Sequence, residues 1–276
     1  MLVESRRRAL LDLVNRQGFA TLEELVRATG ASESTIRRDL EALDQAGAIK
    51  RTHGGAVCSG DVRSMPALDE RATSAAAEKA AIGRAVAGLV EDGETILLDG
   101  GTTTLEVARA LVGRPLQVVT NSLPIAALLA TSKDTDLILI GGYVYPRTGV
   151  AMGPLAVATM QNIRVRRAVL GAGGITSEGV FNSNSLLVET ERQMMTCGQD
   201  VLIVADHSKF GRQSLSRLCG LDEIDRVVTD SGISASDREM LREAGVELMV
   251  AAVEAGEDPS NGDGQPRTQG SRTQPR

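Results

Sequence analysis

The chain has 276 residues, which is enough for two domains, and 42% of them are hydrophobic with no tryptophan, so the cores should be aliphatic. Its net charge of −6 argues against a protein that coats or bends nucleic acid without sequence preference. Three widely spaced cysteines and two histidines lack the spacing of a zinc site, so no metal is expected, and free thiols in a reducing cytoplasm are predicted.

Residues 1–57 have the pattern of a DNA-binding helical domain. Apolar residues within 10–14 indicate a first helix. Thr21 and Glu24 form a capping box, in which each side chain accepts a hydrogen bond from the other's backbone, and this predicts the start of a second helix. Gly30 then makes a tight turn into a third. Three helices with a glycine-containing turn between the last two describe a helix-turn-helix.

The third helix is amphipathic. Ser32 can cap its N-terminus. Ile36, Leu40 and Leu43 fall at i, i+4 and i+7, so they form one buried stripe, and Gly47 is expected to end the helix. A turn of about 100° per residue places polar side chains on the opposite face. That face carries Ser34, Arg38, Glu41 and Gln45, with Arg37 beside them.

A short basic segment at residues 50–55 ends in a glycine turn and looks like a wing beside this helix. In such a unit the N-terminal part of the recognition helix contacts base edges, while flanking groups contact phosphates. The base contacts are expected from Ser34, Thr35, Arg37 and Arg38. The backbone contacts are expected from Arg6 to Arg8, from Lys50, Arg51 and His53 in the wing, and from the capped helix ends at Thr21 and Ser32. An arginine pair alone is more often a solvated helix face, but the order of capping box, turn and basic wing favours DNA.

The remainder of the chain is predicted to be a linker (58–74), an α/β domain (75–252) and a disordered tail (253–276). The tail is rich in Pro, Gly, Ser, Gln and Arg. In the α/β domain, continuous apolar runs alternate with helical segments, as is typical of parallel strands covered on both faces. These runs are residues 95–98, 116–119, 137–140, 168–170, 201–204, 226–229 and 246–250. The sequence therefore predicts an α/β protein with a Rossmann-like parallel sheet behind a winged helix-turn-helix.

No apolar run approaches the roughly 20 residues that cross a bilayer. The N-terminal arginines are not followed by the apolar stretch of a signal peptide. We therefore expect a cytoplasmic protein without membrane contact.

Polar residues follow the first five predicted strands of this sheet. Residues 99–104 (DGGTTT) combine glycines, hydroxyls and a helix N-terminus, which is the chemistry of a phosphate cradle. Ligands of open α/β sheets bind at the carboxyl ends of the strands, so these residues predict a polar, anion-binding pocket. Residues 171–174 (GAGG) lack the complete dinucleotide fingerprint, so no nucleotide cofactor is expected.

The chain resembles the DeoR-type bacterial transcription regulators over about residues 1–250. The motifs that carry this resemblance are STIRRDLEAL, IKRTHGGA, DGGTTT, VTNS, LIGG, GP, DHSKFG and VVTD, in that order. The resemblance implies a sensor domain related in fold to ribose-5-phosphate isomerases and CoA transferases. It also implies a homodimeric or homotetrameric repressor of carbohydrate-metabolism genes that a phosphorylated sugar releases from operator DNA. Matched by position, the effector pocket falls on Asp99, Gly101, Thr102, Thr103, Thr104, Asn121, Ser122, Gly141, Asp206 and Lys209.

The related isomerases offer an alternative function, an enzyme acting on a sugar phosphate. They resemble this chain at residues 206–209 (DHSK), but they also carry carboxylates just after the fourth strand and a lysine shortly beyond. Here residues 172–174 are Ala-Gly-Gly, and the next carboxylate is Glu178. Glu191 matches one isomerase position but alone makes an incomplete site. Sensing is therefore favoured over catalysis, with no catalytic residue predicted, while the metabolite, the operator and the choice between repression and activation stay open.

Overall fold

The computed structural model describes residues 3–17, 19–46, 48–52, 54–58 and 68–253. The predicted helix end at Gly47, the wing residue His53 and residues 254–276 of the predicted tail lie outside the described residues.

The N-terminal part is a winged helix-turn-helix. Its helices are α1 (Val3–Gln17), α2 (Leu22–Thr29) and α3 (Glu33–Gln45), and its strands are β1 (Phe19–Thr21), β2 (Ile49–Thr52) and β3 (Gly55–Cys58). The strands pair antiparallel in the order β1-β3-β2. The predicted stripe of Ile36, Leu40 and Leu43 is buried in an aliphatic core with Leu10 and Val14 of α1.

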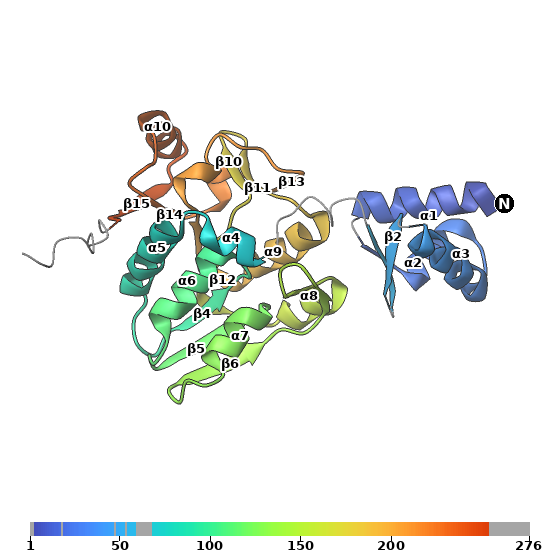
Figure 1. Ribbon diagram of the computed structural model, residues 1–276, viewed down its shortest axis with the longest axis horizontal. Coiled ribbons are helices and arrows are strands. Elements are labelled where there is room, and N and C mark those ends of the chain that lie inside the picture. Colours follow the sequence, from blue (N-terminus) through green and yellow to red (C-terminus); the bar gives the residue numbers. More distant parts are fainter. Residues whose placement is uncertain (1–2, 18, 47, 53, 59–67, 254–276) are drawn as a thin grey trace, which may run out of the picture.

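The larger part is built on a parallel seven-stranded sheet in the order β15-β14-β12-β9-β4-β5-β6 (Figure 1). These strands are β4 (Thr95–Leu98), β5 (Leu116–Thr120), β6 (Thr135–Leu139), β9 (Val165–Gly171), β12 (Gly198–Val204), β14 (Arg226–Asp230) and β15 (Glu247–Ala251). The chain adds strands on one side of β4 and then, from β9, on the other side. The strand order therefore reverses between β4 and β9, which is where such sheets leave a crevice for a ligand.

Helices cover both faces of this sheet, which explains why its strands are apolar throughout. One face packs against α5 (Ala76–Leu89), α6 (Thr102–Leu111) and α7 (Leu123–Leu129). The other face packs against α8 (Pro154–Met160), α9 (Ser185–Cys197) and α10 (Ala235–Glu243). Gly83 lets α5 approach α6 closely, because a Cβ there would lie 2.6 Å from the carbonyl oxygen of Glu106.

The predicted α/β fold class is confirmed, and all seven predicted apolar runs are strands of the main sheet. The sequence did not indicate five short strands: the hairpin β7 (Tyr143–Tyr145) with β8 (Val150–Met152), and a small antiparallel sheet of β10 (Gly174–Thr176), β11 (Gly179–Asn182) and β13 (Ser216–Cys219). Two 3₁₀ turns, η1 (His207–Lys209) and η2 (Leu221–Glu223), follow β12 and β13. Within the predicted linker the structure forms a helix, α4 (Leu68–Thr73). Among the described residues, no helix is long and apolar enough to cross a membrane.

Candidate DNA-binding surface and effector pocket

Side-chain caps fix both helices of the turn. Thr21 donates its backbone N–H to Glu24 Oε2 (2.7 Å), and Glu24 returns a backbone hydrogen bond to the Thr21 hydroxyl (3.2 Å). Ser32 accepts a hydrogen bond from the backbone N–H of Thr35 (3.4 Å), and its hydroxyl lies 2.8 Å from the Thr35 hydroxyl. These caps orient the start of α3, where the hydroxyls of Ser32, Ser34 and Thr35 cluster.

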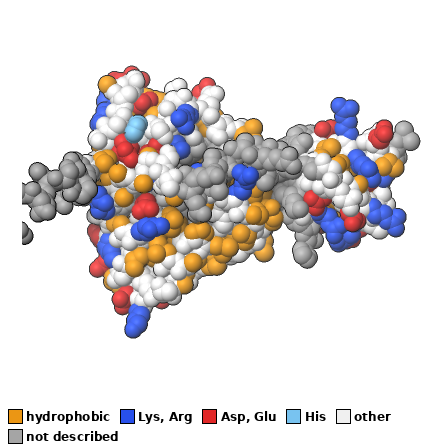
Figure 2. Space-filling model, in the orientation of Figure 1, with side chains coloured by type: hydrophobic (Ala, Val, Ile, Leu, Met, Phe, Trp, Pro, Cys, Tyr) orange, Lys and Arg blue, Asp and Glu red, His pale blue; other side chains and the backbone are white. Residues whose placement is uncertain are grey.

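The exposed face of α3 presents the two predicted arginines differently. Arg37 is held by Glu33 one turn earlier, with 2.6 Å between Nη2 and Oε1. Arg38 is exposed and has no hydrogen bond or ion pair with the described residues. Figure 2 shows the N-terminal domain with Lys and Arg side chains interspersed with Asp and Glu. Of the two arginines, Arg38 is therefore the one without a partner among the described residues.

The described part of the wing is tied to the end of α3. The backbone N–H of Arg51 donates to Asp44 Oδ2 (3.2 Å), and the Arg51 guanidinium lies 4.0 Å from Glu41. Lys50 is in β2, but its side chain, like all of His53, lies outside the described residues.

Two arginines of α1 that are predicted to contact DNA phosphates also make ion pairs within the helix-turn-helix. Asp39 on α3 is 3% exposed, and its carboxylate accepts hydrogen bonds from Arg6 Nε (2.6 Å) and Arg7 Nε (2.9 Å). Burial acts to raise the pKa of Asp39, but the two arginines outweigh it, so the pKa lies below its ordinary value. Arg6 and Arg7 therefore hold α1 against α3 through Asp39, and their predicted phosphate contacts stay a prediction.

We expect Asp39→Asn to lower the free energy of unfolding of the helix-turn-helix by about 1–3 kcal/mol, because it weakens two charge-assisted hydrogen bonds. Since the folded-state pKa of Asp39 is depressed, its stabilisation is complete above the ordinary aspartate pKa of about 4 and disappears as the pH falls through the lower folded value. Thermal unfolding followed between about pH 7 and pH 3 tests this. A D39N variant as stable as the parent at neutral pH would contradict it, and exposed Asp136→Asn is the control.

A cavity of about 400 Å³ opens at the carboxyl ends of β4 and β9, where the strand order reverses. Asp99 lies at its floor and is 4% exposed; its carboxylate accepts hydrogen bonds from the backbone N–H groups of Gly100 (2.5 Å) and Gly171 (3.2 Å). Gly100 must be glycine, because a Cβ there would lie 2.1 Å from Val150 Cγ2. The wall is formed by Arg71, Ser74, Lys79, Asp99, Gly100, Gly101, Thr102, Thr103, Thr148, Val150, Gly171, Ala172, Gly173, Asn182, Ser183, Leu187, Glu191, Lys209, Arg212 and Ser214.

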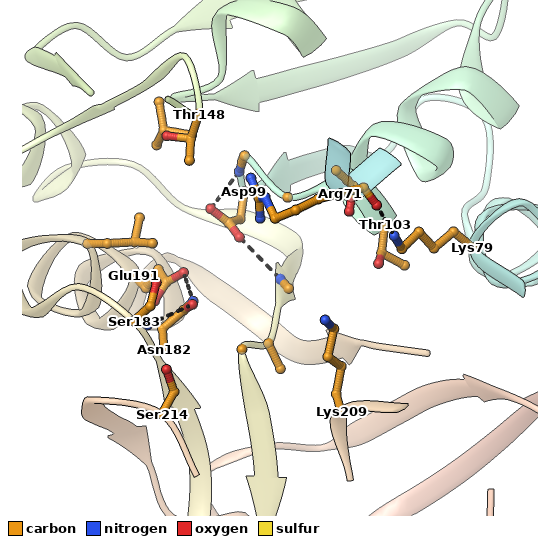
Figure 3. Close-up of a pocket in the computed structure, with 18 of the residues that line it drawn as sticks. Arg71, Lys79, Asp99, Thr103, Thr148, Asn182, Ser183, Glu191, Lys209 and Ser214 are labelled. Atoms are coloured by element: carbon orange, nitrogen blue, oxygen red, sulfur yellow. Dashed lines mark hydrogen bonds between the residues drawn. The ribbon is translucent and has the colours of Figure 1, made fainter. Parts of the chain in front are cut away.

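Positive groups gather on one side of the cavity (Figure 3). Arg71 comes from α4, Lys79 from α5 and Lys209 from η1, and Thr103 in the first turn of α6 lies beside Lys79. Thr102, the first residue of α6, also lines the cavity. The first N–H groups of a helix have no carbonyl partner within it, so this end of α6 attracts anions. Nε and Nη2 of Arg71 are buried without a hydrogen-bond partner in the described chain, and Lys209 also has none there.

The Lys79 side chain also makes hydrogen bonds within the protein. Its ammonium group donates to the carbonyl oxygens of Arg71 (2.6 Å) and Ser74 (2.5 Å), so it holds the end of α4 against the cavity. The side chain is 4% exposed, and burial lowers its pKa while the charge of Asp206 opposes that change. An ammonium has three donors, which leaves one for a ligand.

The opposite side of the cavity carries carboxyl, amide and hydroxyl groups. Glu191 from α9 is fully buried and accepts a hydrogen bond from Asn182 Nδ2 (2.7 Å). Burial raises the pKa of Asp99, against the opposing effect of its backbone hydrogen bonds and of Arg71. The cavity therefore has Lys79 and Lys209 on one side and Glu191, Asn182 and Thr148 on the other, with Asp99 and Arg71 between them (Figure 3). Arg212 also lines it.

Half of the predicted effector residues lie in the cavity wall. These are Asp99, Gly101, Thr102, Thr103 and Lys209. Residues 102 and 103 open α6, and Lys209 reaches in from the turn after β12, as the strand-end argument predicts.

The other predicted effector residues do not line the cavity: Thr104, Asn121, Ser122, Gly141 and Asp206. Thr104 caps α6 through Gly101, and Ser122 caps α7 by accepting from the Ile125 N–H (3.4 Å). Asn121 donates to the carbonyl oxygen of Ala151 (3.0 Å) and so fastens the β7–β8 hairpin.

Asp206 and Gly141 lie away from the wall for different reasons. Asp206 accepts hydrogen bonds from the backbone and hydroxyl of Ser208 and shapes the turn that presents Lys209. Gly141 is exposed after the edge strand β6. These five residues therefore lie outside the cavity wall, and their contact with an effector stays a prediction.

Sequence reasoning missed several wall residues, including Arg71, Lys79, Thr148, Asn182 and Glu191 as ligand contacts. Arg71 stood in the predicted linker, and Asn182 is on a short antiparallel strand that leaves little pattern. Among the described residues, no group of three or more His, Cys, Asp or Glu side chains could hold a metal ion.

Both parts of the chain match family models. Residues 6–60 match the DeoR-like helix-turn-helix domain, and residues 74–231 match the DeoR C terminal sensor domain. The chain belongs to the DeoR family of transcription regulators. This confirms the resemblance drawn from its motifs and makes the chain a DNA-binding regulator, so the isomerase alternative is not supported.

Curated relatives of this DeoR-family protein are similar over nearly their whole length. The glycerol-3-phosphate regulon repressor of Escherichia coli (strain K12) is 34% identical over 245 residues, covering 88% of this chain and 97% of the relative. The HTH-type transcriptional repressor GlcR of Bacillus subtilis (strain 168) is 30% identical over 258 residues, covering 94% and 100%. Among solved structures, ribose 5 phosphate isomerase A from Neisseria gonorrhoeae is 18% identical with a TM-score of 0.35, covering 51% of this chain and 54% of that one. A TM-score at this level carries no argument about activity.

Proposed function

We propose that this DeoR-family protein is a sequence-specific repressor of carbohydrate-metabolism genes that a phosphorylated sugar or related anionic metabolite releases from its operator. The observation that carries the proposal is the cavity at the strand-order reversal. Arg71, Lys79, Lys209 and the N-terminus of α6 lie on one side of it, and hydrogen-bonding groups for an uncharged portion line the other side; Arg212 also lines the cavity.

The phosphate is proposed to bind between Thr102, Thr103, Arg71 and Lys209. A phosphate accepts hydrogen bonds from backbone N–H groups at a helix N-terminus, and cations at the same place add charge-assisted bonds. The similar repressor of Escherichia coli is named for glycerol 3-phosphate, a phosphorylated polyol, which belongs to the same chemical class.

On the DNA side, Ser34, Thr35, Arg37 and Arg38 are proposed to contact base edges in the major groove, with Arg51, Lys50 and His53 at the backbone. We propose a homodimer or homotetramer acting in the cytoplasm, with half-sites about 34 Å apart or a multiple of that.

The connection between the two sites is proposed to run through α4. This helix supplies Arg71 to the cavity, is clamped by Lys79, and begins at Leu68, whose N–H donates to the Arg147 carbonyl oxygen (3.2 Å) beside Thr148. The chain between the helix-turn-helix and the cavity thus ends in a ligand-contacting element. A ligand shifts the DNA-binding equilibrium only through different affinities for the two states, and movement of α4 would provide that difference.

Fluorescence anisotropy of a duplex from the gene's own upstream region, challenged with phosphorylated and free sugars, tests the function. We expect specific binding that one phosphorylated sugar relieves and its free sugar does not. Lys209→Ala and Thr103→Ala should each weaken the response to that sugar about tenfold or more, because each removes a phosphate donor, and leave operator affinity nearly unchanged.

Loss of operator binding in the same variants would contradict the division between the two domains. Turnover of a sugar phosphate by the purified protein would revive the enzyme alternative. Lys133→Ala, an exposed lysine away from the cavity wall, is the matched control.

A further inference from the structure

The cavity wall opposite Lys79 and Lys209 contains a buried carboxyl group that is not among the proposed phosphate contacts. Glu191 is 0% exposed, and only one of its oxygens is satisfied: Oε1 accepts the hydrogen bond from Asn182, while Oε2 has no partner in the described chain. The Thr148 hydroxyl, also in the wall and 4% exposed, is likewise buried without a partner. Buried polar atoms are nearly always hydrogen-bonded. Two unpartnered polar atoms on one side of a cavity therefore indicate that a ligand supplies their hydrogen-bond partners.

The surroundings of Glu191 determine what kind of group that is. No ion pair joins Glu191 to a cation in the described part of the chain, and the charged group facing it from β4 is another buried carboxyl, Asp99. Burial and the proximity of Asp99 raise the pKa of Glu191 well above its ordinary value, while the hydrogen bond from Asn182 opposes them. From β13 the thiol of Cys219 lies near it, and burial first and then the charge of Glu223 raise the Cys219 pKa to about 12, so the thiol is uncharged. Glu191, Asn182 and Thr148 thus offer a ligand hydrogen-bonding groups and no positive charge, whereas a second phosphate would need a cation beside them.

Resting on the proposed function, we infer that Glu191, oriented by Asn182, forms with Thr148 a subsite for an uncharged oxygen of the effector. Glu191 is in its carboxylic acid form there and donates its Oε2–H to a carbonyl or hydroxyl oxygen of the ligand. The Thr148 hydroxyl provides a second hydrogen bond. In Figure 3 these side chains lie across the cavity from Lys79 and Lys209. The effector is therefore a monophosphate that carries hydroxyl or carbonyl groups at the end away from its phosphate. A bisphosphate with a second phosphate at that end should bind more weakly.

The test distinguishes this subsite from the proposed phosphate-binding residues by comparing ligands of increasing size. Dissociation constants are measured by calorimetry for inorganic phosphate, glycerol 3-phosphate, and a set of hexose 6-phosphates and hexose 1,6-bisphosphates. For wild-type protein we expect at least one polyol or sugar monophosphate to bind more tightly than inorganic phosphate. Glu191→Leu should reduce that selectivity about tenfold or more, because a buried ligand oxygen loses its partner. Its affinity for inorganic phosphate should change less than threefold.

A second pair of variants guards against misfolding and identifies the protonation state. Glu191→Gln keeps a neutral donor at the same place and should retain selectivity within about threefold. Thr148→Val, which removes only the hydroxyl, should reduce selectivity in the same direction as Glu191→Leu. The matched control is Glu189→Gln, an exposed glutamate on the same helix.

Each outcome has one meaning. Unchanged selectivity in Glu191→Leu, or equal losses in Glu191→Leu and Glu191→Gln, overturns the subsite while leaving the phosphate sensor in place. A bisphosphate that outcompetes the corresponding monophosphate in wild type also overturns it. If no phosphorylated probe binds wild type, the proposed function itself fails.

Discussion

Arg38→Ala is expected to abolish specific operator binding while leaving ligand binding unchanged. Arg38 is exposed on the recognition helix and has no partner in the described chain, so its guanidinium is free to form a bidentate contact with a base. Losing such a contact costs about 1–3 kcal/mol at each half-site, and the losses add over the half-sites of an oligomer. Anisotropy with the upstream duplex and with a scrambled duplex measures the loss of preference.

Arg37→Ala is the matched comparison one residue away. Arg37 is already paired with Glu33, so a contact with DNA must first break that pair, and we expect a smaller loss than for Arg38→Ala. Unchanged operator affinity in Arg38→Ala would refute the assignment of this helix face to base contacts. A larger loss in Arg37→Ala would move the main contact to the paired arginine.

Lys79→Met is expected to give a protein that binds both operator and ligand but no longer responds to the ligand. Methionine keeps the length and apolar stem of the side chain but leaves the carbonyl oxygens of Arg71 and Ser74 without their donor. The end of α4 is then no longer held to α5, so ligand binding in the cavity no longer changes the position of α4 or the affinity for operator DNA. Coupling between two sites is worth about 1–3 kcal/mol in typical regulators, so the ligand effect on operator affinity should fall from roughly 5–150-fold to less than threefold.

The measurement must be made at saturating ligand, because Lys79 also lines the cavity and its loss weakens binding. Thermal shift of the variant establishes the concentration that saturates it, and anisotropy at that concentration gives the remaining effect on DNA. Full release of DNA by the saturated variant would contradict a route through α4. Lys133→Met, on the exposed surface, controls for the change of residue type.

The main sheet was predictable from the sequence because each of its strands has a recognisable pattern in its own few residues. Each parallel strand is covered on both faces, so four or five successive apolar residues, as in 95–98, mark it without knowledge of its neighbours. The short strands β10 and β11 pair with each other, β11 also pairs with β13, and Ile175 of β10 forms a bridge with Phe210. These strands depend on that packing more than on their own composition.

The candidate site was predictable where it follows directly from strand ends. Thr102, Thr103 and Lys209 reach the cavity because the chain leaves β4 and β12 there. Arg71 and Glu191 could not be predicted in the same way, since α4 and α9 come to the cavity through tertiary packing. Ser122, which is predicted to contact the effector and is found to cap α7, shows the reverse problem: a polar residue after a strand can be a helix cap as well as a ligand contact.

The arginines at the start of the chain illustrate a similar ambiguity. A run of three arginines before a DNA-binding helix has the composition of a phosphate contact, but Asp39 lies thirty-three positions beyond Arg6 in the sequence and meets it only in the folded domain. Nothing in the local pattern distinguishes the two uses.

The β7–β8 hairpin gives this protein an optical label of its own. The chain has no tryptophan and only two tyrosines, and both of them, Tyr143 and Tyr145, are on β7. Tyr145 packs in a cluster with Val150 and Leu187, two residues of the cavity wall. Tyrosine emission from the purified protein therefore originates beside the cavity alone, so a change in its intensity or lifetime during a titration reports on this hairpin without any introduced fluorophore. A single tryptophan placed anywhere else in the chain would be equally unambiguous, and energy transfer from the two tyrosines to it would measure how far that point moves from the ligand.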